Sequence, residues 1–337
     1  MITIKEELIE AKKVFKRVGY ALFFCALITL LFEIGISVLF DTLLEKGIDL
    51  VNNDWYIWVL TDVPLYCFGF IAFILIIKKT PKEIKEKVKL KFKDLLTYML
   101  MCFPIANVGS LIGTGLSYVL TNNTSVNPLD EYLEGNFVLR IIFMAILAPI
   151  FEELVFRKVL IDHTRKYGDQ IAILFSGLAF GLFHMNLYQF FYAFALGMFF
   201  AYIYTKTSDI KYTIIMHMVF NFVGSVISAY ILSLDLSVLE TDLESILMSS
   251  ENINSIIIPM LSIEAYVLAF YIVNVVGVIL LVKKRKEFKQ GLESSIIPKK
   301  LIFKIVYLNS GYILYVVFTT ALSLVNLYGI KLSSLFK

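Results

Sequence analysis

Cysteine is scarce in this sequence, and the few that occur lie far apart. The 337 residues include three cysteines, Cys25, Cys67 and Cys102, and no two of them form a CxxC pair. This spacing does not indicate a disulfide framework or a zinc ribbon. Each cysteine lies in an apolar run, so we interpret all three as small buried hydrophobic residues. No A-x-A site follows the first apolar run, which is too long for a signal-peptide core, so we expect that run to be retained.

Charge is also scarce. Charged residues make up 18% of the chain and hydrophobic residues 58%, and the mean hydropathy is +0.78. A soluble domain of this length would have a smaller hydrophobic share. Several apolar runs reach the ~20 residues that a helix needs to cross a bilayer. The composition therefore predicts a polytopic membrane protein with an all-α fold and no detached soluble domain.

Nine apolar stretches predict a bundle of about nine transmembrane helices. They cover residues 18–40, 56–77, 95–120, 138–163, 169–186, 188–205, 212–233, 256–282 and 305–328. We divide the chain into three parts on this basis. Residues 1–137 hold three N-terminal helices and a basic cytoplasmic linker, residues 138–233 hold a core of four helices, and residues 234–337 hold an acidic outer loop and two C-terminal helices.

The loops predict the orientation, because Lys and Arg are enriched on the cytoplasmic side of a membrane. Residues 1–17, 78–94 and 283–304 contain five, eight and eight basic residues. Residues 121–137 and 234–255 are acidic and contain none. We therefore expect a multi-pass protein of the cell (plasma) membrane with a cytoplasmic N-terminus. The Ile-, Lys- and Asn-rich composition favours a bacterial origin.

The basic linker, residues 78–94, is also amphipathic. We interpret it as a solvated stretch on the lipid surface, and a helix that docks a partner protein is the alternative.

Polar side chains gather in one part of the apolar core. Ionisable groups inside membrane spans cost several kcal/mol each, so they are candidates for function. Two of the chain's three histidines belong to this set. The candidates are Glu152, Glu153, Arg157, His184, His217 and Asn221. The third histidine, His163, lies in a polar stretch at a predicted cytoplasmic turn and is expected to be solvated.

Helical geometry predicts which of these side chains meet. Glu153 and Arg157 are four residues apart and share a helix face, so they can pair. Glu152 is rotated by about 100° from Glu153 around the helix axis, so it does not share Arg157 as a partner. A turn near Tyr167 joins two antiparallel helices and places Glu152 and His184 each roughly 23 Å from it. We therefore expect Glu152 and His184 to come level, together with His217 and Asn221, which share a face of a later helix.

A carboxylate, two imidazoles and an amide can activate water. Glu152 and one histidine can deprotonate a water molecule, and another histidine with Asn221 can donate to a developing oxyanion. Alternatively, Glu152, His184 and His217 can hold a divalent metal such as zinc with a position open for water. Both versions predict hydrolysis of an acyl bond.

Three motifs carry a resemblance to a known family. The segments EELVFR, FGLFH and HMVFN match, in order, the EExxxR, FxxxH and HxxxN/B motifs of the CAAX-protease and bacteriocin-processing (CPBP, or Abi) family. This family comprises intramembrane proteases similar to CAAX prenyl protease type 2. The resemblance covers about residues 138–226. It implies that Glu152 activates water, and that His184 is its partner or a metal ligand.

The same resemblance implies that His217 and Asn221 stabilise the transition state, and that Glu153 and Arg157 are orienting charges. It also implies a membrane-associated substrate, such as a leader peptide, a signalling peptide or a CAAX-like protein. We expect membrane lipid as a further partner and no nucleic acid. Signatures of three other intramembrane protease classes, HExxH, GxGD and GxSG, are missing from the sequence.

Two other classes of function stay open. One is a non-catalytic membrane scaffold that regulates a membrane kinase or confers self-immunity to a bacteriocin. The other is a transporter with charged residues along its path, although no paired Gly- or Pro-broken helices support it. Glu33, Asp62 and Glu264 lie in or near predicted spans and match no motif. Glu33 and Glu264 can line a substrate path or pair with Arg140.

Overall fold

The computed structural model describes residues 4–234 and 253–330. Helices are the only regular elements in those residues, which confirms the all-α prediction. Most of the acidic outer loop, residues 235–252, lies outside the described residues.

The first half of the chain supplies the outer helices and the helix that carries the glutamates. The elements are α1 (Ile4–Glu45), α2 (Tyr56–Pro64), η1 (Leu65–Gly69), α3 (Phe70–Ile77), α4 (Phe92–Thr121), α5 (Asp130–Glu134), α6 (Phe137–Arg140), η2 (Ile141–Leu147), α7 (Ala148–Glu153), η3 (Leu154–Val159), α8 (Leu160–Thr164) and η4 (Arg165–Tyr167). Elements α2 to α3 form one continuous rod, and so do elements α6 to α8.

The second half supplies the histidines and the C-terminal helices. The elements are α9 (Asp169–Phe183), α10 (Leu187–Thr207), α11 (Ile210–Asn221), η5 (Phe222–Ile227), α12 (Ser228–Leu232), α14 (Ile253–Lys284), η7 (Glu287–Lys289), α15 (Lys299–Ile302), η8 (Phe303–Tyr307) and α16 (Ser310–Leu327).

Nine helical rods in the described residues correspond to the nine predicted spans. Seven of them are long and apolar enough to cross a membrane. The other two are the rod from α6 to α8, which carries the glutamates, and α9, which has 15 residues. A helix of 15 residues is about 22 Å long, shorter than a hydrocarbon core of ~30 Å. A polytopic helical bundle is confirmed, and nine full crossings stay a prediction.

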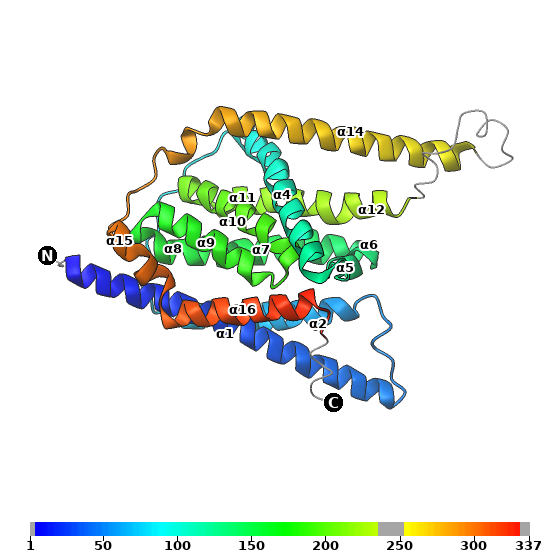
Figure 1. The fold of residues 1–337 in the computed structure, drawn as a ribbon, viewed down its shortest axis with the longest axis horizontal. Helices are drawn as coiled ribbons and strands as arrows, with labels where there is room; N and C mark the ends of the chain where they lie inside the picture. The colour runs from blue at the N-terminus through cyan, green and yellow to red at the C-terminus, as the bar shows by residue number, and fades with distance from the viewer. Residues whose placement is uncertain (1–3, 235–252, 331–337) are drawn as a thin grey trace.

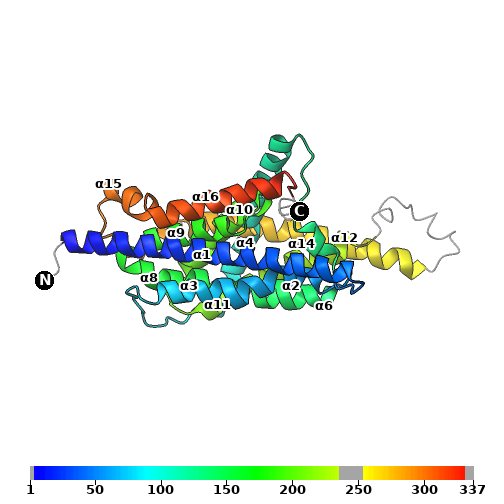
Figure 2. The ribbon, with the colours of Figure 1, turned by 90° about the horizontal axis from the view of Figure 1, so that it is seen from below.

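The helices that carry the polar residues lie at the centre of the bundle (Figure 1). Helix α10 packs between α9 and α4, and α11 packs against α7. Helix α1 pairs with α16 and α3, side by side along the molecule (Figure 2). Helix α14 covers the opposite side and contacts α4. The polar residues are therefore enclosed by helices on several sides.

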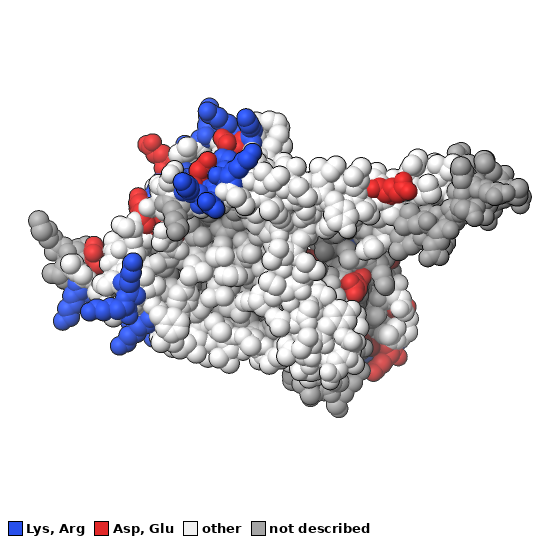
Figure 3. All heavy atoms as spheres, turned by 45° about the horizontal axis from the view of Figure 1, so that its top comes forward, with Lys and Arg blue, Asp and Glu red and all other residues white. Residues whose placement is uncertain are grey.

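Basic side chains gather at one end of the molecule. On the face shown in Figure 3, Lys and Arg cluster at the end where α1 begins, whereas acidic side chains dominate the opposite end. This polarity agrees with the charge bias of the loops, and the cytoplasmic N-terminus stays a prediction.

Small residues let the central helices approach closely. A Cβ atom added to Gly109 of α4 would lie 2.5 Å from Cα of Tyr192, and one added to Gly113 would lie 2.7 Å from the carbonyl oxygen of Leu187. Such contacts are typical of helix packing in membranes. Because Gly109 and Gly113 have no side chain, α4 packs closely against the first turns of α10, and Tyr192 lies beside the polar residues.

The basic linker does not form a docking helix. Residues 81–91, which we call the strap, have no helical structure and run across the ends of three helices. The backbone N–H of Glu83 donates to the carbonyl of Asp162 over 2.7 Å, and that of Val88 donates to the carbonyl of Thr207 over 2.7 Å. The N–H of Leu90 donates to the hydroxyl of Tyr212 over 2.9 Å. The strap therefore ties α8, α10 and α11 together at the end with the basic residues.

The prediction that His163 is solvated is wrong. His163 is buried, and its Nδ1 lies 2.7 Å from the hydroxyl of Thr80 and 2.8 Å from the carbonyl of Pro81. The imidazole anchors the start of the strap at Pro81, which lies 82 residues earlier in the chain.

Candidate active site

The two glutamates lie on a helix of irregular pitch. Element α7, which ends at Glu153, is flanked by the π-helical stretches η2 and η3. Single π-turns within helices are frequent at functional sites because they shift the rotation of the side chains that follow. The stretch η3 begins directly after Glu153, and η2 ends at Leu147, about one turn before Glu152.

Glu153 and Arg157 form the ion pair that their spacing predicts. Glu153 Oε2 lies 3.2 Å from Arg157 Nε, and both side chains are 0% exposed. The guanidinium group also lies over the ring of Phe180, with Cζ 4.3 Å from the ring centre. Each buried charge thus has an oppositely charged partner, as buried charges require.

Glu153 has a second partner that the sequence does not predict. Its Oε1 accepts a hydrogen bond of 3.0 Å from Nδ1 of His217 on α11. A carboxylate paired with Arg157 can only accept, so the hydrogen of neutral His217 sits on Nδ1. Nε2 then faces Glu152, whose Oε2 lies 3.6 Å away. The imidazole stands between the two glutamates, and Glu153 fixes its tautomer and direction.

His184 lies at the end of α9 rather than within a helix that continues to residue 186. It is the residue that follows the last helical position, and Met185 next to it has a positive φ of 47°. The side chain of Asn186 then accepts from the backbone N–H of Tyr188 and begins α10. Nδ1 of His184 donates to the carbonyl of Phe180 over 2.8 Å, which leaves Nε2 as the free nitrogen.

Helix α16 supports the turn that carries His184. The Tyr315 hydroxyl donates to the carbonyl of Ala179 over 2.7 Å, and Nδ2 of Asn326 donates to the carbonyl of Met185 over 2.9 Å. Irregular backbone at membrane depth is tolerated where protein or a water-filled cavity surrounds it. Helix α16 supplies part of that surrounding.

Asn221 links two helices. Its Nδ2 donates to the carbonyl of Met144 in η2 over 2.9 Å. This bond uses one of the two amide hydrogens, and the other stays available for a second acceptor. Asn221 therefore has a structural contact as well as a position on the cavity wall.

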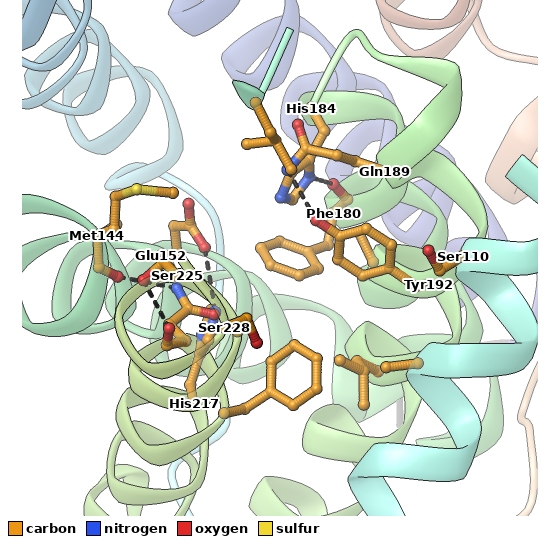
Figure 4. Close-up of a pocket in the computed structure, with 18 of the residues that line it drawn as sticks. Ser110, Met144, Glu152, Phe180, His184, Gln189, Tyr192, His217, Ser225 and Ser228 are labelled. Carbon is orange, nitrogen blue, oxygen red and sulfur yellow. Dashed lines mark hydrogen bonds and ion pairs between the residues drawn. The ribbon is translucent and has the colours of Figure 1, made fainter. Parts of the chain in front are cut away.

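Glu152, His184, His217 and Asn221 line one cavity of about 450 Å³, as the helical geometry predicts. In Figure 4, Glu152 and His217 lie on one side of this cavity, and His184, Gln189 and Tyr192 lie on the other. No hydrogen bond or ion pair joins Glu152 to His184 in the described part of the chain. We call this space the active-site cavity.

Two further polar residues that no motif in the sequence predicts line the cavity. Gln189 Nε2 donates to the hydroxyl of Tyr192 over 2.8 Å, and both residues line the active-site cavity. Their spacing of three residues on one face of α10 is the only signal in the sequence, and it is a weak one.

A second cavity of about 350 Å³ adjoins the first. Glu152, His184 and Gln189 line both. Glu33 and Asp62 line the second cavity, whereas Glu264, which we expected beside Glu33 on a substrate path, is exposed on α14. Arg140 does not pair with Glu33 and donates instead to the backbone carbonyl of Leu133.

The donor types of Glu152, His184 and His217 suit zinc, and each imidazole has Nε2 free, but their placement does not form a metal site. Within residues 4–234 and 253–330, no three His, Cys, Asp or Glu side chains gather closely enough to hold a metal ion. His184 stands across the cavity from the other two. We therefore derive the chemistry from the side chains alone.

The fold and the site define a multi-pass membrane protein with a carboxylate–imidazole centre among its helices. Residues 134–223 match the family model described as type II CAAX prenyl endopeptidase Rce1-like. All six candidate residues fall inside this match. The chain is also similar to the membrane-embedded CAAX protease MroQ of Staphylococcus aureus (strain USA300), with 29% identity over 191 residues. That alignment covers 52% of this chain and 74% of the relative.

No solved structure matches the chain. The two sequence comparisons confirm the resemblance to the CAAX-protease and bacteriocin-processing family, and they support an intramembrane protease.

Proposed function

We propose that this protein is an intramembrane endopeptidase that cleaves a membrane-associated peptide or protein through water activated by Glu152. The observation that carries the proposal is the arrangement of Glu152, His217 and Glu153 at the wall of the active-site cavity. Glu153 orients His217, and His217 presents Nε2 toward Glu152 over 3.6 Å. Arg157 pairs with Glu153 and not with Glu152.

The proposed reaction begins with Glu152 as general base. It accepts a proton from a water molecule whose oxygen attacks the scissile carbonyl carbon. Charge develops on the carbonyl oxygen, and the second amide hydrogen of Asn221 donates to it. His217 shares this role only when Nε2 carries a second hydrogen in addition to the one on Nδ1. Collapse of the tetrahedral intermediate breaks the C–N bond, and the proton held by Glu152 passes to the leaving amine. His184 Nε2 faces the same cavity and can position the water.

Leader peptides, signalling peptides and CAAX-like proteins are the substrate classes that we propose. We also propose that the protein resides in the plasma membrane of a bacterium with its N-terminus in the cytoplasm. The clustering of basic residues at one end supports this orientation. A zinc-dependent form of the same hydrolysis, with Glu152, His184 and His217 as ligands, is an alternative proposal and requires these side chains to gather more closely.

Comparative membrane peptidomics tests the proposed function. Cells that express the wild type are compared with cells that express Glu152→Gln, which keeps the shape of the side chain and removes the base. We expect a set of cleaved peptides that is present with the wild type and absent with the variant. Glu264→Gln on α14 is the matched control, because it also removes a carboxylate from a helix but lines neither cavity.

An unchanged peptide profile in Glu152→Gln would contradict the proposal. If cellular function also survived in this variant, a non-catalytic scaffold would become the better account of the fold.

A further inference from the structure

The second cavity is lined by acidic groups from the N-terminal helices. Glu33 comes from α1 and Asp62 from α2, and the hydroxyl of Thr61 lies 3.4 Å from Oδ2 of Asp62. The lining includes no lysine or arginine. In the described residues, no basic side chain pairs with either carboxylate. Glu33 and Asp62 thus differ from Glu153, whose charge Arg157 offsets.

Carboxylates at membrane depth need a cation or a proton to offset the loss of water. Among the described residues, no lysine or arginine reaches this cavity. The binding free energy of a positively charged ligand group would therefore be more favourable here than at a site where the carboxylates are already paired. Acidic groups alone do not define a ligand, but the wall of this cavity also holds a hydrogen-bond donor without an acceptor in the described residues.

Trp58 is that donor. It lines the second cavity, it is 2% exposed, and its indole N–H has no hydrogen-bond acceptor in the described part of the chain. Its ring stacks on Phe143 at 5.2 Å and meets the edge of Tyr132 at 5.3 Å, so two other residues of the cavity wall hold it in place. An indole can only donate, and the group it lacks is an acceptor such as a peptide carbonyl.

The position of the cavity connects these groups to the reaction. Glu152 and His184 form part of both cavities. A peptide with its scissile bond at Glu152 can extend into the second cavity within a few residues. The chemistry there, one donor for a carbonyl and two acidic groups, suits a peptide that carries a positive charge.

We propose that the second cavity is a substrate subsite that binds a positively charged group of the peptide near the scissile bond. Glu33 and Asp62 supply the opposite charge, and the N–H of Trp58 donates to a peptide carbonyl. The positive charge is an ammonium or guanidinium group, on a Lys or Arg side chain or at the free N-terminus of the peptide. This inference rests on the proposed peptidase function and adds the class of substrate to it.

The test starts from peptides that the wild type cleaves and Glu152→Gln does not. Cleavage sites mapped in this set should have a Lys, an Arg or a free N-terminus at a fixed distance from the scissile bond. One such peptide is then synthesised in three forms. The first keeps the positive group, the second replaces Lys by norleucine or Arg by citrulline, and the third has an acetylated N-terminus. The second and third forms distinguish a side-chain charge from a terminal one.

The purified full-length protein in detergent should cleave the charged form with a kcat/KM at least tenfold above that of the neutral form. In the variant Glu33→Gln/Asp62→Asn this preference should fall to about one, chiefly through a higher KM for the charged form. Trp58→Phe removes the N–H but keeps an aromatic ring, and it should raise KM for all forms. Glu264→Gln should keep the preference of the wild type. A melting curve shows that each variant is folded.

The outcomes separate this inference from the proposed function. Cleavage without a preference for the charged form, or a preference that survives in Glu33→Gln/Asp62→Asn, would overturn the subsite and leave the peptidase assignment intact. Absence of any cleavage that depends on Glu152 would overturn both.

Discussion

Glu153 and His217 are joined by a hydrogen bond of 3.0 Å between α7 and α11, in a part of the bundle where Glu153 is 0% exposed. The same carboxylate is paired with Arg157. Because Arg157 holds Glu153 in place, the hydrogen bond to Glu153 determines the direction of the His217 ring. A ligand or catalytic imidazole commonly depends on such a partner for its tautomer.

This relationship predicts that Glu153 and His217 act as a unit. Glu153→Gln should lower kcat/KM by a large factor because an amide can present its NH₂ group to Nδ1 and reverse the tautomer. His217→Ala should lower it at least as much. The double variant should be no worse than His217→Ala alone, because groups that act together are not additive. A double-mutant cycle on kcat/KM measures this, and independent, multiplying effects would contradict it.

Arg157→Ala should destabilise the protein. It leaves Glu153 as a buried carboxylate with no cation, which typically costs about 3–5 kcal/mol. The melting temperature in detergent should fall, and activity should fall with it. Lys166→Ala is the control, since Lys166 is partly exposed and pairs with Glu10 near the surface, where a pair contributes at most about 1 kcal/mol. Equal melting temperatures for the two variants would argue against a paired Glu153.

Asn221→Ala should have a milder effect on activity than loss of Glu152. Removal of one oxyanion donor lowers kcat by about 10²–10³. The bond from Asn221 to the carbonyl of Met144 is lost as well, so some loss of thermal stability is expected. Steady-state kinetics and a melting curve separate the two effects. A variant that loses stability but keeps kcat would limit Asn221 to joining the helices.

The purified protein should keep its activity in the presence of metal chelators. Glu152 and His217, which we propose activate water, lie 3.6 Å apart between Oε2 and Nε2, while no three candidate ligands gather in the described residues. Turnover of a membrane peptide is measured with and without a strong zinc chelator, alongside the metal content of the sample. Loss of activity with the chelator, restored by added zinc, would favour the zinc-dependent alternative.

Asp209, at the turn between α10 and α11, should make the strap sensitive to acid. Burial alone would raise the pKa of this carboxyl, but its bonds to Lys211 and Lys87 outweigh burial and lower the pKa. Its contribution to stability is complete above the usual carboxyl pKa of about 4 and is lost as the pH falls through the lower folded value.

We expect Asp209→Asn to reduce the drop in melting temperature between pH 6 and acid conditions below about pH 4. Lys87→Met should reduce the same drop, because it removes the cation 3.3 Å from Asp209. An acid-induced drop equal to that of the wild type in both variants would show that other groups determine it.

Contacts within one helix could be predicted from the sequence, and contacts between helices only in part. The pair of Glu153 and Arg157 follows from a spacing of four residues, and the presence of four polar residues around one cavity follows from counting residues to a turn. The bond between Glu153 and His217 depends on how α11 is rotated against α7. Both helices are apolar on most faces, so periodicity does not reveal that rotation.

The predictions for His163 and His184 are wrong for physical reasons. His163 lies in a polar stretch that suggests exposure, but Thr80 and Pro81, far away in sequence, cover it. His184 was placed within a helix because the apolar run continues past it. Asn186, which begins the next helix by accepting from the backbone, was the signal that α9 ends earlier.

The contacts of Asn326 and Tyr315 with the turn around His184 have a consequence for biosynthesis. During synthesis, every motif residue from Glu152 to Asn221 enters the membrane before α16 does. The nascent chain therefore carries all six candidate residues while the backbone around His184 still lacks two of its hydrogen bonds. If the cavity takes its final form only when α16 docks, the activity that we propose for this site begins only after α16 has been inserted, and cleavage of the translocation machinery or of neighbouring nascent chains during synthesis is avoided.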